Sequence, residues 1–328
     1  MDEKSTTHGI KNFKKKLSGS FIVGNVCILI ASIFWGVNVS VTKALIPDWM
    51  TSEGITAVRL IGGAVLFWAA SLFVKNDKID RHDWIRVIAG GLIGLFGFIY
   101  LFVMSLKFGS PIDISIIMTL PPMFVILIGV IFLKQRPSWL EYAGLAVGFA
   151  GAVTVILGAG QSGRAGSDDL LGDLLAILSC ICYAGYLVIL QKPTKKYRPV
   201  SLLRWVFLFS ALPALFLLPG FDRMPIIHTS EAVPWIEIGF ILLCPTFIAY
   251  FLVQPAEKAI GSELVSLYQY LLPVFATVSA VLMGLDRLRW IQVLAMVIIV
   301  AGMIMTNLGR KHRKTGNPAP VTSSRKNP

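Results

Sequence analysis

Uncharged side chains that could bind a small molecule lie inside long apolar stretches of this chain. Aromatic, amide and hydroxyl groups occur near the centres of these stretches, and the candidates are Trp35, Asn38, Tyr100, Thr119, Tyr183, Tyr186, Tyr268 and Gln269. Ring faces and a few hydrogen bonds from such groups can hold a small solute. The alternative is structural, because Asn and Gln bridge helices in membranes and Tyr anchors at membrane surfaces. We predict that these residues line a cavity.

Prolines interrupt two of the same stretches, at Pro121-Pro122 and at Pro273. Proline removes a helical hydrogen bond, and irregular backbone at membrane depth is tolerated where it lines a cavity or packs against neighbours. We therefore predict broken helices beside the cavity at Pro122 and Pro273, with a simple packing kink as the alternative.

Two cations, Arg59 and Arg204, lie a few residues inside apolar stretches. A charge at membrane depth is costly and is a functional hypothesis by default. We favour a gating or structural ion pair for both, over snorkelling to headgroups and over direct contact with a substrate. The centres of the stretches hold no Asp, Glu, Lys, Arg or His. We therefore expect a neutral, zwitterionic or aromatic substrate and no charged side chain where it binds.

Several other classes of protein fit this pattern poorly. An intramembrane enzyme needs a nucleophile with a base, or a metal cluster, and no Cys or His spacing suits a metal. We expect no enzyme, no metal and no cofactor. The net charge is +12, but Lys and Arg lie in short connectors and both tails, which argues against nucleic-acid binding. A receptor-like or structural membrane subunit is compatible with these observations.

The composition requires a lipid environment, since 55% of the residues are hydrophobic and 15% are charged, against about 25% charged in soluble domains. About 20 apolar residues cross the ~30 Å hydrocarbon core as a helix. Ten such spans are predicted, at 21–43, 54–74, 85–106, 113–133, 139–158, 170–190, 200–219, 234–253, 264–284 and 290–308. The predicted fold class is an all-α integral membrane protein with ten transmembrane helices.

The distribution of Lys and Arg predicts the orientation of these helices. With the N-terminus in the cytoplasm, 21 of them fall on the inner side and six on the outer side. This asymmetry follows the positive-inside rule. We predict a multi-pass protein of the cell membrane (inner or plasma membrane) with both termini cytoplasmic. The basic tails, 1–20 and 309–328, are expected to be flexible.

An internal repeat organises the spans. At a spacing of 151 residues the same residue types recur in one register, and the pairs are Trp84 and Trp235, Lys107 and Lys258, Pro122 and Pro273, Arg136 and Arg287, and Trp139 and Trp290. At slightly shorter offsets Trp35 falls opposite Tyr183, and Arg59 opposite Arg204. The predicted domains are two five-helix repeats, 21–158 and 170–308. Because five is odd, the second repeat is inverted in the membrane.

Inverted repeats are typical of secondary transporters, in which they surround one central site that opens to either side. Three sequence segments carry a more specific resemblance: FWGVNVSVTK from residue 34, AVRLI around Arg59, and PPMFVILIGVIFLKQRPSWLEYAGLAVGFAGAV from residue 121. The last is echoed by LPVFATVSAVLMGLDRLRWIQVLAMVIIVAGMI from residue 272. Over its membrane region the chain resembles EamA-type permeases of the drug/metabolite transporter superfamily.

This resemblance implies proton- or exchange-driven export of small metabolites, such as amino acids, through a cavity between the two halves. Such permeases usually carry an acidic residue before the basic one at the end of helices 4 and 9. Asp286 fits this pattern, but Gln135 departs from it. The expected partners are a small-molecule substrate and the lipid bilayer, and a homodimer is compatible with the sequence.

Overall fold

The computed structural model describes residues 3–46, 48–134, 137–159 and 167–316, so Gln135 and Arg136 lie outside it. Within these residues the ordered elements are helices, with no strand. Nine helical segments are long and apolar enough to cross a membrane, and they match nine of the ten predicted spans. The remaining prediction, 264–284, is divided in two, and its second part is the shorter apolar helix Leu272–Leu282.

The first half of the chain forms five membrane segments from seven α-helices, and these are α1 (Glu3–Leu45), α2 (Ser52–Ser71), α3 (Trp84–Ala89), α4 (Phe96–Phe108), α5 (Pro111–Ile117), α6 (Pro121–Leu133) and α7 (Trp139–Ala159). A 3-10 turn, η1 (Arg81–Asp83), precedes α3, and a π-helix, η2 (Gly90–Leu95), joins α3 to α4. Local chemistry sets several starts. Thr51 accepts a hydrogen bond from Gly54 N at 3.1 Å and caps α2.

The second half contains seven α-helices, and these are α8 (Ser167–Lys196), α9 (Pro199–Ala214), α10 (Pro225–His228), α11 (Ala232–Leu243), α12 (Ala249–Tyr268), α13 (Leu272–Leu282) and α14 (Trp290–Gly316). A π-helix, η5 (Cys244–Ile248), joins α11 to α12, and a 3-10 turn, η6 (Gln269–Leu271), joins α12 to α13. Two further 3-10 turns, η3 (Leu215–Leu217) and η4 (Phe221–Arg223), lie between α9 and α10.

Irregular backbone recurs in both halves at matching positions. The helix break between α5 and α6, at 118–120, lies 151 residues before η6 at Gln269–Leu271. The π-helix η2 falls, at the same spacing, on 241–246, which overlaps η5. The caps of the last helices also match, because Ser138 N donates to Glu141 Oε2 at 2.6 Å and Arg289 N donates to Gln292 Oε1 at 2.8 Å.

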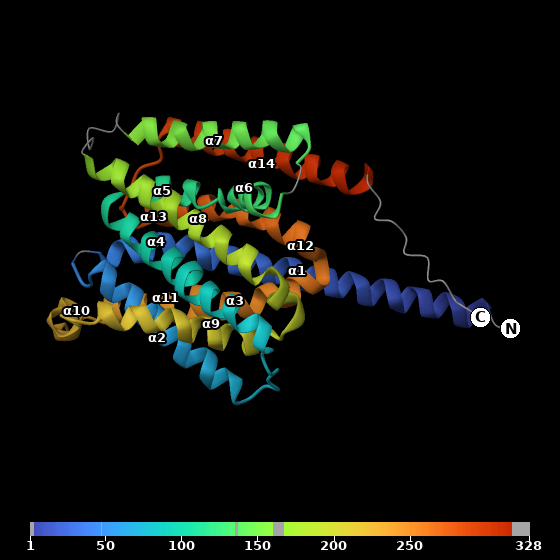
Figure 1. Cartoon of the computed structure of the whole chain (residues 1–328), viewed down its shortest axis with the longest axis horizontal. Helices are drawn as coiled ribbons and strands as arrows, with labels where there is room; N and C mark the ends of the chain where they lie inside the picture. Colours follow the sequence, from blue (N-terminus) through green and yellow to red (C-terminus); the bar gives the residue numbers. More distant parts are fainter. Residues whose placement is uncertain (1–2, 47, 135–136, 160–166, 317–328) are drawn as a thin grey trace.

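Two pairs of helices that are equivalent in the two halves pack closely against each other. Figure 1 shows α7 and α14 side by side along one edge of the molecule, while α2 packs on α9. Glycine allows the first pair to approach closely, since a Cβ on Gly302 would lie 2.4 Å from Gly148 N. The remaining principal contacts join α4 to α8 and α1 to α12 and α13.

Helices extend into three segments that were expected to be a loop or a flexible tail. Residues 254–263, expected as a loop, lie within α12, and α1 begins at Glu3 inside the expected flexible tail. Likewise α14 continues to Gly316. Ala, Glu and Lys are good helix formers, so a drop in hydropathy marks the membrane boundary without ending the helix. Figure 1 shows the first turns of α1 extending beyond the bundle.

Candidate functional site

A cavity lies among the helices of both halves, and six of its fifteen wall residues are aromatic. Its residues are Trp35, Asn38, Val39, Arg59, Phe98, Ile99, Phe102, Met118, Pro121, Tyr183, Phe207, Pro245, Thr246, Tyr250 and Leu272. They come from α1, α2, α4, α6, α8, α9, η5, α12 and α13 and from the break before α6. The volume of the cavity is ≈ 90 Å³.

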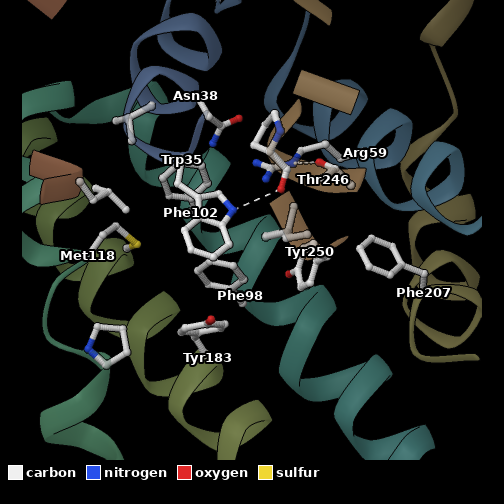
Figure 2. A pocket seen from close by; sticks show the side chains of 15 residues that line it. Trp35, Asn38, Arg59, Phe98, Phe102, Met118, Tyr183, Phe207, Thr246 and Tyr250 are labelled. Carbon is white, nitrogen blue, oxygen red and sulfur yellow. Dashed lines mark hydrogen bonds between the residues drawn. The ribbon is translucent and has the colours of Figure 1, made fainter. Parts of the chain in front are cut away.

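The π-helix η5 holds Trp35 in place. The indole Nε1 of Trp35 donates to Pro245 O at 3.2 Å, as the dashed line in Figure 2 marks. A π-turn leaves backbone groups out of the regular helical ladder, so a carbonyl there can accept a bond from a neighbouring helix. The ring of Trp35 is thereby fixed with one face toward the cavity, opposite Phe98 and Tyr183, whose rings lie 4.6 Å apart.

Arg59 is the charged side chain of the cavity wall. Its exposed fraction is 6%, and its Nε donates to Thr246 Oγ1 at 3.1 Å. The guanidinium lies over the ring of Phe102, 5.9 Å from the centroid. Its Nη1 is buried and has no hydrogen-bond partner among the described residues. Figure 2 shows the guanidinium between Trp35 and Tyr250, within the cavity.

The expectation that no charge reaches the cavity is therefore wrong, whereas the ion pair expected for Arg59 stays a prediction. The described residues include no salt bridge to Arg59. Depth along the helix suggested a position near the membrane surface. The side chain instead points inward from the buried face of α2, where Ile55, Leu60 and Phe67 pack.

Arg204, its equivalent in the second half, has a different environment. The guanidinium carbon lies 5.2 Å from the ring centroid of Trp68 and 5.5 Å from that of Trp205. Trp205 packs in turn on Trp84, with centroids 4.9 Å apart. Arg204 is thus held by aromatic faces away from the cavity wall. The described residues include no ion pair for Arg204 either. The two arginines, although equivalent in the repeat, therefore lie in different environments.

The structure brings only part of the predicted cavity set together. Trp35, Asn38 and Tyr183 line the cavity, whereas Tyr100, Thr119, Pro122, Tyr186, Tyr268 and Pro273 are not in its wall. The side chain of Gln269 lies outside the described residues. The two helix breaks do reach the wall, through Pro121 in place of Pro122 and Leu272 in place of Pro273.

Four of the six residues outside the wall make identifiable local contacts. Tyr268 Oη donates to Asn25 Oδ1 at 2.7 Å, which ties α12 to α1. Thr119 Oγ1 donates to Ile116 O at 2.6 Å within the helix break. Tyr186 stacks behind Tyr183, with centroids 5.8 Å apart, and Tyr100 stacks on Phe96 at 5.7 Å.

The wall residues that were not predicted include Phe98, Phe102, Phe207 and Thr246. The phenylalanines resemble the many others of an apolar chain, so nothing in their sequence positions distinguishes them. Thr246 follows Pro245 inside a span, and a proline at that depth is a signal that could have identified η5.

Two polar clusters join the halves at opposite ends of the segment formed by α3, η2 and α4. At one end Asp113 accepts from Arg289 Nη2 at 2.5 Å and from Gln292 Nε2 at 2.8 Å. At the other, Asp83 accepts from Lys196 Nζ and from Tyr197 Oη, each at 2.8 Å. Both clusters connect a carboxylate of the first half to donors of the second.

Known proteins resemble this chain over most of its length. A model of the EamA-like transporter family matches it twice, at residues 22–157 and 170–308. An uncharacterized transporter of Bacillus subtilis (strain 168), YyaM, is 25% identical over 289 residues, which cover 85% of this chain and 92% of that protein. The aromatic amino acid exporter YddG of Ancylobacter novellus is 25% identical over 292 residues, which cover 89% of this chain and 98% of that protein.

Two further comparisons agree with these. A probable amino-acid metabolite efflux pump of Salmonella typhimurium is 22% identical over 293 residues, covering 88% of this chain and 95% of that protein. One crystal structure aligns with a TM-score of 0.59 at 20% identity, covering 89% of this chain and 98% of that one, and it supports the fold alone. With the family model matching both halves, the chain is a multi-pass membrane protein that belongs to the EamA-like transporter family.

Proposed function

We propose that the chain is a secondary transporter that exports small neutral, zwitterionic or aromatic metabolites, such as amino acids, by alternating access. The supporting observation is the cavity, which takes residues from both halves and has aromatic rings around Asn38 and Arg59. Inverted repeats around a central site are how many secondary transporters alternate between two openings. Two relatives named as amino-acid exporters favour the same class of substrate.

The proposed location is the cell membrane, with both termini in the cytoplasm and export as the physiological direction. The excess of Lys and Arg in the connectors predicted to be cytoplasmic supports this orientation. Residues 21–158 and 170–308 are proposed to act as the two moving halves, since both polar clusters link one half to the other.

Transport by purified protein in proteoliposomes tests the proposal. Vesicles loaded with a mixture of radiolabelled amino acids should release aromatic or apolar members faster than protein-free vesicles. Trp35→Ala should weaken apparent affinity by roughly 5- to 150-fold, because losing one such buried contact costs about 1–3 kcal/mol.

Trp139 supplies the matched control, since its side chain is 83% exposed on the outer surface of α7. Trp139→Ala should insert and transport like the unaltered chain. Equal transport by Trp35→Ala and Trp139→Ala would remove the cavity from the pathway, and no transport of any mixture component would contradict the proposed function itself.

A further inference from the structure

Among the described residues, none forms a salt bridge with the guanidinium of Arg59. One neutral hydroxyl, Thr246 Oγ1, accepts from Nε, and the ring of Phe102 faces the carbon at 5.9 Å. Nη1 is buried without an acceptor, and the cavity wall formed by the described residues contains no Asp or Glu. A permanent cation therefore faces the cavity with donors left over.

Such an arrangement is costly unless something in the cavity supplies an acceptor. Arginine keeps its proton under all ordinary conditions, so it cannot become neutral as a buried Lys or Asp can. A buried charge without a partner strongly destabilises the fold. The planar guanidinium of arginine can form two parallel hydrogen bonds with one carboxylate. An anion that enters and leaves the cavity would supply the missing partner.

The rest of the wall decides which kind of anion fits. The rings of Trp35, Phe98, Tyr183 and Tyr250 line the same cavity as the guanidinium, and the described wall offers no second cation. A phosphate or another multiply charged anion would lack a second cationic partner there. A single carboxylate attached to an aromatic or apolar body would use both the fork and the rings.

We propose that Arg59 is the carboxylate-binding residue of the cavity and that the substrates are aromatic or apolar monocarboxylates in which the amino group is dispensable. The described wall lacks a carboxylate that could pair with an ammonium group, so an amino acid and its deaminated analogue are expected to bind alike. This inference rests on the proposed function, because it names the chemical group by which the transported solute is held.

Four probes with the same ring separate these chemical features. 3-Phenylpropanoate and 3-phenylpropanamide have the same shape and differ in charge, whereas phenylalanine and phenylalaninamide add the amino group to each. Dissociation constants are measured by the quenching of tryptophan fluorescence in the full chain, purified in lipid nanodiscs without chloride. The carboxylates should bind roughly 10- to 150-fold more tightly than the matching amides. Phenylalanine and 3-phenylpropanoate should agree within a few-fold.

Variants then assign the preference to one residue. Arg59→Gln should bind the carboxylates and the amides with similar affinities, and Arg59→Lys should retain a reduced preference because it keeps the charge and loses the fork. Arg204→Gln is the matched control, since that cation lies at the equivalent position of the second half and outside the cavity wall. It should keep the full preference of the unaltered chain.

The ligand series on the unaltered chain stands even if Arg59→Gln fails to fold. Equal binding of carboxylate and amide, no binding of any probe, or a preference that survives Arg59→Gln would each overturn the inference. The inference would also be overturned if chloride raised the melting temperature of the protein and the carboxylate probes did not. In that case a small inorganic ion would be the partner of Arg59. Carboxylate preference without transport in proteoliposomes would contradict the proposed function and leave the binding inference standing.

Discussion

Arg59 and Thr246 join α2 to the π-helix η5 through one hydrogen bond of 3.1 Å in the cavity wall. The Thr246 hydroxyl also donates to Ile241 O at 2.8 Å, which orients its lone pair toward the guanidinium. The threonine thus links a cation of the first half to an irregular turn of the second. Its contribution to stability can be separated from substrate binding.

Thr246→Val keeps the shape of the side chain and removes the hydroxyl, leaving Arg59 Nε buried without its acceptor. We expect a loss of about 1–3 kcal/mol in the free energy of unfolding. Denaturant unfolding in mixed micelles, followed by tryptophan fluorescence, measures the change. Thr246→Ser retains the hydroxyl and should be close to the unaltered chain. A valine variant as stable as the serine variant would show that water replaces the threonine.

Residue positions could be predicted only where chemistry restricts them. Trp35 and Asn38 were recognisable because polar groups are rare at that depth, and both line the cavity. Tyr268 looked equivalent by the same reasoning, but its hydroxyl reaches Asn25 on α1. The direction of a side chain depends on the rotation of its helix about its axis. In a helix that is apolar all round, the sequence pattern carries little information about that rotation.

At the scale of elements, α7 and α14 approach so closely that their backbones touch. A Cβ on Gly302 would lie 2.4 Å from Gly148 N and 2.7 Å from Gly144 O, and neither backbone atom can move aside alone. The two helices are equivalent in the repeat, so the contact joins the last helix of each half.

Gly302→Ala should destabilise the chain by about 1–3 kcal/mol, because overpacking forces the helices apart. The melting temperature of purified protein reports the effect. Gly239 in α11 is the matched control, since a Cβ there meets nothing within 4 Å. Gly239→Ala should be neutral or stabilising, by up to about 1 kcal/mol from helix propensity. A fall in melting temperature as large for Gly239→Ala as for Gly302→Ala would contradict the contact.

Helix breaks and π-turns differ in how far they could be predicted. Breaks at Pro121-Pro122 and before Pro273 follow from a missing N–H, which is a local property of proline. The π-helix η2 contains Gly90, Gly91 and Gly94, and no residue in it requires the wider turn. Its glycines pack on Leu190, Phe209 and Tyr186, so tertiary contacts determine it.

At the scale of the whole molecule, polar clusters link the two halves at both ends of the segment formed by α3, η2 and α4. Asp113 with Arg289 and Gln292 forms one, and Asp83 with Lys196 and Tyr197 forms the other. In alternating access one end opens while the other stays closed, so weakening one cluster should favour opening at its own end.

Asp113→Asn should expose the cavity at the end of the molecule where α5 begins, and Asp83→Asn at the opposite end. A cysteine in place of Met118, on a background without native cysteines, reports this through its labelling rate with an impermeant reagent applied to one face of oriented vesicles. A shift of about 1.4 kcal/mol changes the open population, and hence the rate, roughly tenfold. Asp222→Asn, in an exposed turn, is the control. Identical rates for all three variants would show that neither cluster holds an end closed.

Orientation in the membrane is a separate prediction. In a variant with a single cysteine in place of Thr229, that cysteine should react with the impermeant reagent from outside intact cells. In a second variant, a single cysteine in place of Thr194 should react only after permeabilisation. The expectation follows from the 21 to six distribution of Lys and Arg. Labelling of Thr194 in intact cells would reverse the proposed orientation and, with it, the meaning of export.

The close pairing of α7 with α14 has a consequence for how such a protein diversifies. In the described part of the chain neither helix contributes to the cavity wall. Mutations that alter the cavity wall can therefore accumulate without disturbing the glycine contact between α7 and α14. Adaptation to new solutes should draw on the other eight membrane segments, whereas variation in heat tolerance between descendants should concentrate in these two.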